Sequence, residues 1–134
     1  MRDVIDWSEL RHAAALAREH AYAPYSHYKV GAALLDTSGR IHAGANVENA
    51  SYGLCLCAER SAFGRAIPDG VTAFRAIFVL TPGEAPGTPC GMCRQVLAEL
   101  APSIPVRCET VGGARLDTSV AALLPFAFDA EKLK

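Results

Sequence analysis

The chain has 134 residues, of which 51% are hydrophobic and 20% charged, and its 13 Lys and Arg nearly balance its 14 Asp and Glu. This length supports one domain with a substantial core, and the balanced charge offers no basic patch, so we expect a single domain over residues 1–134 that binds no nucleic acid. No apolar run is long enough to cross a bilayer and residues 1–10 are acidic rather than signal-like, which predicts a soluble, cytoplasmic protein with no membrane partner.

Apolar spacing and turn residues predict these elements in chain order: a helix over 6–21, a strand over 28–35, a turn over 36–39, a strand over 40–45, a loop over 46–53, a helix over 55–67, a strand over 74–81, a loop over 82–89, a helix over 91–101, a strand over 106–110 and a short helix over 119–124. Residues 74–110 form a β-α-β unit, which requires a parallel pair of strands. We therefore predict an α/β fold, a three-layer α/β/α sandwich with a mixed sheet of about five strands.

Five cysteines need a role in the fold or the function, because intracellular thiols stay reduced and an odd number argues against a disulfide scaffold. Cys57, Cys90 and Cys93 lie at predicted helix starts, where free amide groups and the helix dipole favour thiolates. Cys90 and Cys93 have the spacing of two ligands on one turn, and Cys57 adds a third. Three ligands and one open position are typical of a catalytic zinc site. Cys55 and Cys108 are expected to pack as small buried hydrophobic side chains.

The Cys90–Cys93 pair also fits two different kinds of site. A Cys-x-x-Cys pair can be half of a structural zinc site that has a fourth ligand, or the redox dithiol of a thioredoxin-like module. Cys57 and Glu59 weaken the dithiol interpretation, because a two-thiol couple does not need a third thiol or a nearby carboxylate. None of the four histidines has metal-ligand spacing with another, so each is expected to pack or to be solvated.

Glu59 and Arg60 follow the first cysteine ligand and favour the catalytic interpretation. A carboxylate that lies beside a metal-bound water, without being a ligand itself, can accept a proton and deliver it to a substrate. Three thiolates give a zinc site net negative charge, so the site needs a compensating cation. An Arg60 guanidinium bonded to a thiolate sulfur would keep the bound water acidic enough to ionise near neutral pH. Alone, Glu59 would be an ordinary carboxylate at a helix start.

These motifs resemble those of a known family. Residues 57–60 (CAER), 89–95 (PCGMCRQ) and 46–53 (NVENASYG) closely resemble the motifs of the small homotetrameric cytidine deaminases, and the resemblance runs from residues 23–26 (APYS) to Phe128. It implies one zinc ion per subunit and hydrolysis of cytidine and 2′-deoxycytidine to uridine and 2′-deoxyuridine with release of ammonia, in pyrimidine salvage. The deaminase pattern implies the use of a metal-activated water with a glutamate that is not a ligand.

The resemblance also implies roles for individual residues beyond the zinc ligands and the proton shuttle Glu59. Asn46 and Glu48 would hold the ribose hydroxyls, and the Ala58 amide would hold the pyrimidine carbonyl. Tyr28 stands where the family usually has a phenylalanine that packs on the pyrimidine, so its hydroxyl needs a partner or water. In such tetramers, neighbouring subunits complete each site. The resemblance implies this role for Ala50 and Tyr52 and places Phe128 near the pocket.

Two related enzyme classes are alternatives to a cytidine deaminase. Blasticidin-S-type nucleoside deaminases share the Cys-Ala-Glu and Pro-Cys-Gly-x-Cys motifs but lack the Asn-x-Glu-Asn pattern of residues 46–49. Polynucleotide deaminases usually have a histidine at the first ligand position, where this chain has Cys57. Both differences favour cytidine or deoxycytidine as a free nucleoside substrate.

Overall fold

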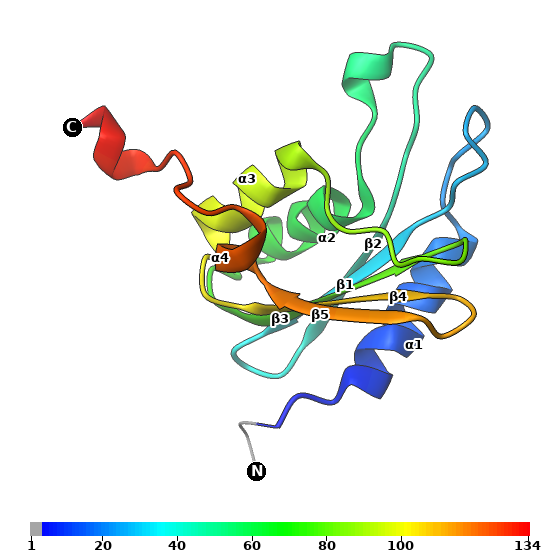
Figure 1. The fold of residues 1–134 in the computed structure, drawn as a ribbon, viewed down its shortest axis with the longest axis horizontal. Coiled ribbons are helices and arrows are strands. Elements are labelled where there is room, and N and C mark those ends of the chain that lie inside the picture. Colours follow the sequence, from blue (N-terminus) through cyan, green and yellow to red (C-terminus); the bar gives the residue numbers. More distant parts are fainter. Residues whose placement is uncertain (1–3) are drawn as a thin grey trace.

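The sequence folds into a five-stranded sheet with helices on both faces, in a computed structural model that describes residues 4–134 (Figure 1). The helices and strands are α1 (Trp7–Glu19), β1 (Gly31–Asp36), β2 (Ile41–Ala45), α2 (Ala58–Ala66), β3 (Phe74–Thr81), α3 (Gly91–Leu100), β4 (Pro105–Thr110), β5 (Arg115–Ser119) and α4 (Val120–Leu123). Residues 1–3, part of the stretch interpreted as acidic rather than signal-like, lie outside the described residues. Within residues 4–134, no helix combines the length and the apolar composition that a membrane crossing requires.

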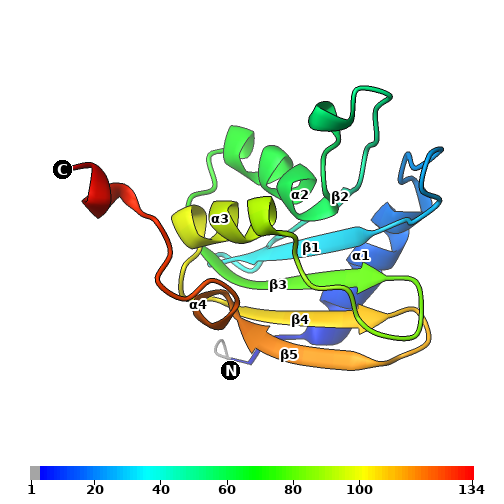
Figure 2. The same ribbon diagram turned by 45° about the horizontal axis from the view of Figure 1, so that its top comes forward.

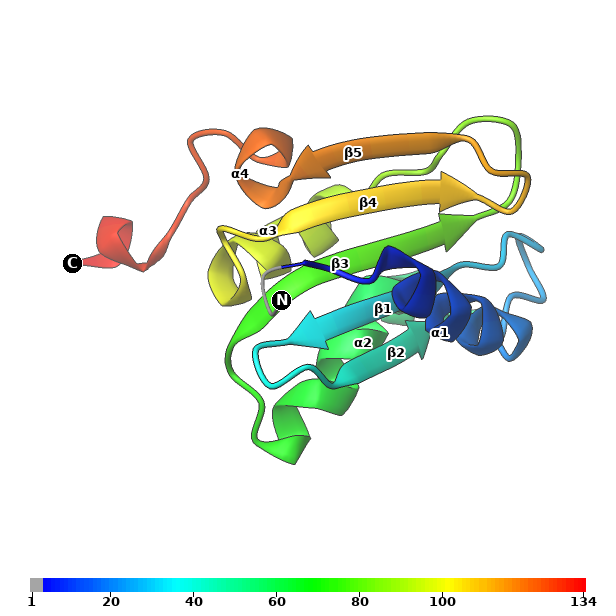
Figure 3. The same ribbon diagram turned by 90° about the horizontal axis from the view of Figure 1, so that it is seen from below.

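The sheet has the strand order β2-β1-β3-β4-β5 and separates the helices into two layers. α2 and α3 lie on one face (Figures 1 and 2), and α1 lies on the other (Figure 3). β3 and β4 run parallel, as the predicted β-α-β unit requires, and the remaining neighbouring strands are antiparallel. The predicted three-layer α/β/α sandwich with a mixed sheet is therefore confirmed.

The core lies on both faces of the central strands. On one face, Leu10 and Ala14 of α1 pack in a cluster of buried side chains with Phe78 of β3. On the other face, Phe63 of α2 and Leu97 of α3 belong to a second cluster, which also contains residues of β1, β3 and β4. β3 is buried on both faces, which agrees with its nearly continuous apolar sequence. The second cluster fixes α2 and α3 beside each other.

Besides shifts at element ends, such as the strand predicted over 28–35 that spans Gly31–Asp36, two local predictions differ from the structure. The strand Arg115–Ser119 was not predicted, because its polar, largely exposed residues lack an apolar face; it forms the edge of the sheet beside β4, where no such face is needed. The helix predicted over residues 55–67 begins only at Ala58, because Tyr52–Leu54 form a separate 3-10 turn and Cys57 is the N-cap of α2. The second difference moves Cys57 from the first turn of the helix to its cap.

Gly44 of β2 allows α2 to pack directly on the sheet. A Cβ atom added at Gly44 would lie 2.3 Å from the backbone nitrogen of Ala62 and 2.6 Å from the backbone oxygen of Ala58. We therefore expect Gly44→Ala to lower the free energy of unfolding by about 2 kcal/mol, as overpacking does.

At Gly64 of α2, by contrast, an added Cβ meets nothing within 4 Å. Because alanine favours a helix, Gly64→Ala should raise the free energy of unfolding by about 0.5–1 kcal/mol.

Urea denaturation of the wild type and the two variants measures both effects. Equal stability of Gly44→Ala and the wild type would contradict the close packing of α2 on β2.

Candidate active site

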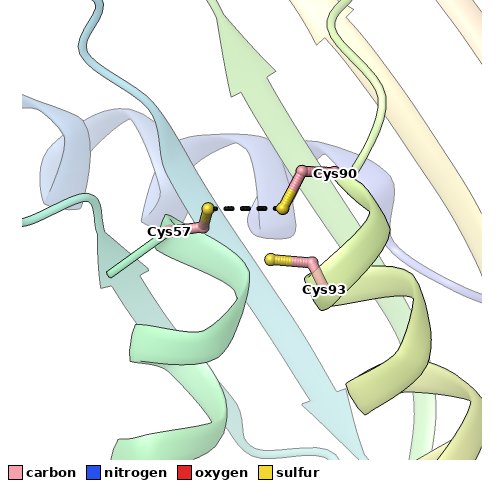
Figure 4. A group of neighbouring side chains, drawn as sticks. All are labelled: Cys57, Cys90 and Cys93. Atoms are coloured by element: carbon pink, nitrogen blue, oxygen red, sulfur yellow. Dashed lines mark hydrogen bonds between the residues drawn. The ribbon is translucent and has the colours of Figure 1, made fainter. Parts of the chain in front are cut away.

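Three cysteine side chains meet where α2 and α3 begin. Cys57 is the N-cap of α2, Cys90 is the N-cap of α3, and Cys93 lies in the first turn of α3. Their sulfur atoms point toward one another (Figure 4) and lie within 4.8 Å of one another. The Sγ atoms of Cys57 and Cys90 are 3.6 Å apart. The fold thus brings together the three cysteines that the sequence singles out.

The geometry of this cluster fits a zinc ion. Thiolates bound to one tetrahedral zinc at about 2.3 Å lie about 3.8 Å apart, close to the separation of the Cys57 and Cys90 sulfurs. Among residues 4–134, no histidine, aspartate, glutamate or further cysteine joins the group. Three protein ligands leave a fourth position for a water or a substrate, as in catalytic rather than structural zinc sites.

The other two cysteines have different environments. Cys108 is fully buried in β4, as predicted. Cys55 is only half-buried, and its Sγ accepts a hydrogen bond from the Asn49 amide at 3.3 Å. The prediction that Cys55 packs as a buried hydrophobic side chain is therefore wrong, because residue 55 lies in the loop before α2, where its sulfur bonds to the backbone.

The histidines have the packing or solvated environments that we predicted. His42 is buried, with its Nε2 atom 2.8 Å from Oδ2 of Asp36. His12, His20 and His27 are exposed.

Glu59 lies in the first turn of α2 beside the cysteine cluster. Only 5% of the residue is exposed. Burial raises the pKa of its carboxyl to about 7, because the charged form loses water; the Cys57 charge adds to this and the Arg60 charge opposes it. A carboxylate with a pKa near neutrality can both accept and return a proton at physiological pH.

Arg60 contacts the first of the three thiols. Its Nη2 donates to Sγ of Cys57 at 3.6 Å and to the carbonyl oxygen of Cys55 at 3.2 Å. Hydrogen bonds from Cys93 and Arg60 lower the pKa of Cys57 to about 5, against the effect of burial. The bond to Cys57, in which Cys93 is the donor, raises the pKa of Cys93, and burial raises it further. A cation thus lies against the sulfur group, as a negatively charged metal site requires.

A cavity of about 410 Å³ opens beside the cluster. This volume is in the range of small-molecule sites. The cavity is lined by Ser26, Tyr28, Val30, Asn46, Glu48, Cys57, Ala58, Glu59, Val79, Thr81, Gly87, Thr88 and Cys90. The residues that we assign to the base and the ribose therefore share one cavity with two of the thiols and with Glu59. A cavity of about 500 Å³ between the start of α1 and the β1–β2 turn contains none of these residues.

Backbone pairing fixes the cavity wall that carries Asn46 and Glu48. The Tyr22 amide donates to the Asn46 carbonyl at 2.9 Å, and the Glu48 amide donates to the Tyr22 carbonyl at 2.8 Å. The Asn46 side chain accepts from the Val30 amide at 2.9 Å and donates to the Tyr28 carbonyl at 2.8 Å. Asn46 therefore holds the backbone around Tyr28, and one N–H of its amide group has no partner among residues 4–134 and can donate to a ligand.

Three residues assigned by resemblance lie outside this cavity. Ala50 is exposed, and Tyr52 is 77% exposed in the projecting loop between β2 and α2. Phe128 is 58% exposed in the C-terminal segment that extends away from the sheet (Figure 1). Within one chain, none of the three contributes to the cavity.

Several residues at the site received no role from the sequence. Ser26 ends the APYS segment, and Thr81 and Thr88 lie outside the motifs, yet all three line the cavity. Arg94 holds the loop before Cys90: its Nε donates to the Pro89 carbonyl at 2.7 Å, and its Nη2 donates to Oγ1 of Thr88 at 2.9 Å. Arg94 comes directly after the ligand Cys93 in the sequence, but only the folded loop shows which oxygen atoms its guanidinium group can reach.

Comparisons with known proteins agree with this geometry. Residues 6–106 match the family described as the cytidine and deoxycytidylate deaminase zinc-binding region. The chain belongs to this deaminase family.

Two relatives and one solved structure match the chain over most of their length. A cytidine deaminase from Sporosarcina psychrophila is 50% identical over 118 residues, which cover 87% of each chain. One from Halalkalibacterium halodurans is 48% identical over 121 residues, which cover 90% of this chain and 92% of the other. The crystal structure of cytidine deaminase from Burkholderia pseudomallei has a TM-score of 0.89 at 48% identity and covers 92% of this chain and 100% of its own.

Proposed function

We propose that this protein is a zinc-dependent cytidine deaminase that hydrolyses cytidine and 2′-deoxycytidine to uridine and 2′-deoxyuridine with release of ammonia. One observation carries the proposal: two thiols of the cluster and the buried Glu59 share a cavity with Asn46 and Glu48. Cys57, Cys90 and Cys93 would hold one zinc ion per chain. The ion would supply a Lewis acid that makes a water molecule acidic enough to ionise near neutral pH.

Glu59 moves the protons of the reaction. Water adds to the ring carbon that bears the exocyclic amine, and Glu59 accepts the proton that this water loses. Glu59 delivers this proton to the adjacent ring nitrogen. It then accepts the proton of the new hydroxyl group on the ring carbon and passes it to the departing amine, so that the carbonyl forms, the carbon–nitrogen bond breaks and ammonia leaves. The pKa of about 7 that burial gives Glu59 suits a group that must both take and give protons.

The cavity residues would hold the nucleoside in this position. The Tyr28 ring would pack on the pyrimidine, and the Ala58 amide at the start of α2 would donate to the pyrimidine carbonyl. Asn46 and Glu48 would bind the ribose hydroxyls. A substrate without phosphate also agrees with the nearly balanced charge of the chain.

We further propose that the enzyme is a homotetramer in the cytoplasm that serves pyrimidine salvage. Tyr52 and Phe128 are exposed aromatic residues on segments that extend from the sheet. Exposed aromatic groups of this kind favour contact with another protein surface. In a tetramer, Ala50, Tyr52 and Phe128 would reach the cavity of a neighbouring subunit.

Bound zinc per chain, measured with the ultraviolet loss of cytidine absorbance, tests the proposed function. We expect about one zinc ion per chain and turnover of both cytidine and 2′-deoxycytidine. Turnover of blasticidin S without turnover of cytidine would favour the blasticidin-type alternative. A zinc site closed to inhibitors, with no turnover of any nucleoside, would indicate a structural zinc module.

Arg60→Gln should move the acidic limb of the pH–rate profile to higher pH, by about one to two units. The substitution removes a positive charge that lowers the pKa values of both Cys57 and Glu59, so both groups would bind protons more strongly. The measurement is kcat/KM for cytidine between pH 4 and 9. Arg65→Gln on the same helix is the control, because Arg65 is exposed and contacts the Ala43 carbonyl instead. A profile identical to that of the wild type would refute the role of Arg60.

A further inference from the structure

Ser26 contacts the carboxylate that we assign to the ribose. Its hydroxyl donates to Oε2 of Glu48, and its backbone amide donates to Oε1 of Glu48 at 3.1 Å. The Tyr25 amide also donates to Oε1, at 3.0 Å. The turn before β1 therefore holds both oxygens of the Glu48 carboxylate.

These contacts determine which part of Glu48 remains available. A carboxylate oxygen accepts about two hydrogen bonds. Oε1 already accepts two backbone N–H groups, whereas within residues 4–134 Oε2 accepts only the Ser26 hydroxyl. A ribose hydroxyl would therefore bind to the second lone pair of Oε2, and the direction of that lone pair depends on the bond from Ser26.

The backbone in turn orients the Ser26 hydroxyl. The Tyr28 amide donates to Oγ of Ser26 at 3.0 Å, so the hydroxyl oxygen is an acceptor there and its own proton is directed to Glu48. His27, between these residues, has a φ of 57°, in the left-handed region that non-glycine residues seldom adopt. This conformation turns the chain back so that the Tyr28 amide faces Ser26.

The hydrogen bond from Ser26 is the largest of several influences that lower the pKa of Glu48 below its usual value. Glu48 therefore remains an ionised acceptor at neutral pH. An ionised carboxylate in a fixed orientation forms stronger hydrogen bonds to hydroxyl groups than a neutral acceptor does.

We propose that Ser26 is a positioning residue that orients Glu48 toward the ribose hydroxyls of the nucleoside. The inference rests on the proposed nucleoside deaminase function and adds a residue that contributes to ribose recognition. Ser26 itself donates its only hydroxyl proton to Glu48, so it acts through that carboxylate.

The test compares zinc-loaded wild type and Ser26→Ala with two substrates, cytidine and 2′,3′-dideoxycytidine. For cytidine, we expect KM to rise about tenfold and kcat to change less than about twofold. The weakened hydrogen bond between Glu48 and the ribose would stabilise the bound substrate and the transition state equally. 2′,3′-Dideoxycytidine has no hydroxyl groups at the 2′ and 3′ positions of the sugar. For this substrate the KM values of the two proteins should agree within about twofold. A merely structural role of Ser26 would raise KM equally for both substrates.

Two further variants control for folding. Ser26→Thr keeps the hydroxyl and should restore KM for cytidine to near the wild-type value. Ser103→Ala removes an exposed hydroxyl in the turn between α3 and β4 and should leave both KM values unchanged. An equal KM rise for both substrates, or no rise for either, would overturn the role of Ser26.

Equilibrium binding makes the same comparison without turnover. Uridine should bind Ser26→Ala about tenfold more weakly than it binds the wild type, whereas 2′,3′-dideoxyuridine should bind both proteins equally. A wild type that binds uridine but does not deaminate cytidine would contradict the proposed function alone. A wild type that deaminates cytidine, with no ribose-dependent difference in Ser26→Ala, would contradict the role of Ser26 alone.

Discussion

Glu59→Gln is expected to lower kcat for cytidine by about 1,000-fold or more while zinc and nucleoside binding persist. Glutamine has nearly the same size as glutamate, so the packing at the start of α2 should survive. Its amide cannot accept a proton from water and return it to the ring nitrogen or the amine. Because one buried carboxylate performs all of these transfers in our proposal, its loss should affect the chemical steps and leave the ligands of the metal unchanged.

The measurements are kcat, the zinc content and the equilibrium binding of uridine, in the same preparation. Glu99→Gln, an exposed carboxylate on α3, is the matched control and should keep wild-type turnover. Turnover of Glu59→Gln within tenfold of the wild type would show that another group moves the protons.

The thiol cluster can be predicted from sequence because its geometry is largely local. Cys90 and Cys93 lie one turn apart on a single helix, and the β-α-β unit determines where that helix begins. Cys57 is far away in the chain, yet it also lies at a helix start, and helices on the same face of a sheet can meet at their ends. The side-chain chemistry and the helix starts therefore suffice for this part of the site.

The ribose end of the cavity cannot be derived in this way. Asn46 and Glu48 flank Val47, which forms isolated bridges with Tyr22 and with Leu56 rather than a strand. Isolated bridges leave no periodic pattern in the sequence. The roles of these residues were available only through family resemblance, and the contact between Ser26 and Glu48 became visible only in the folded turn.

Exposed elements were also difficult to predict from periodicity. β5 is an edge strand with polar residues, so its backbone pairing with β4 defines it and no apolar side chains mark it. Cys55 was misassigned for a related reason: a helix predicted three residues too long placed it on a helical face, whereas it lies in the loop before α2. In both cases backbone hydrogen bonds, which the side-chain pattern does not encode, determine the structure.

Cys93→Ala should abolish stoichiometric zinc binding and, with it, deamination. Cys93 is fully buried, and its sulfur is one of only three candidate ligand atoms that the described residues bring together. Loss of an outer contact of a metal site typically costs about 10–100-fold in affinity, and loss of a direct ligand should cost more. We therefore expect well under about 0.1 zinc per chain after dialysis against a chelator, and no measurable turnover.

Cys108→Ala is the matched control for the loss of a buried thiol. Cys108 is as fully buried as Cys93, but it lies in β4 outside the cluster. Its removal should lower the free energy of unfolding by about 1–2 kcal/mol through the cavity it leaves, with zinc content and kcat unchanged. Zinc retained at one per chain in Cys93→Ala would remove this residue from the ligand set. Zinc lost in both variants would mean that core packing, rather than ligation, causes the effect at residue 93.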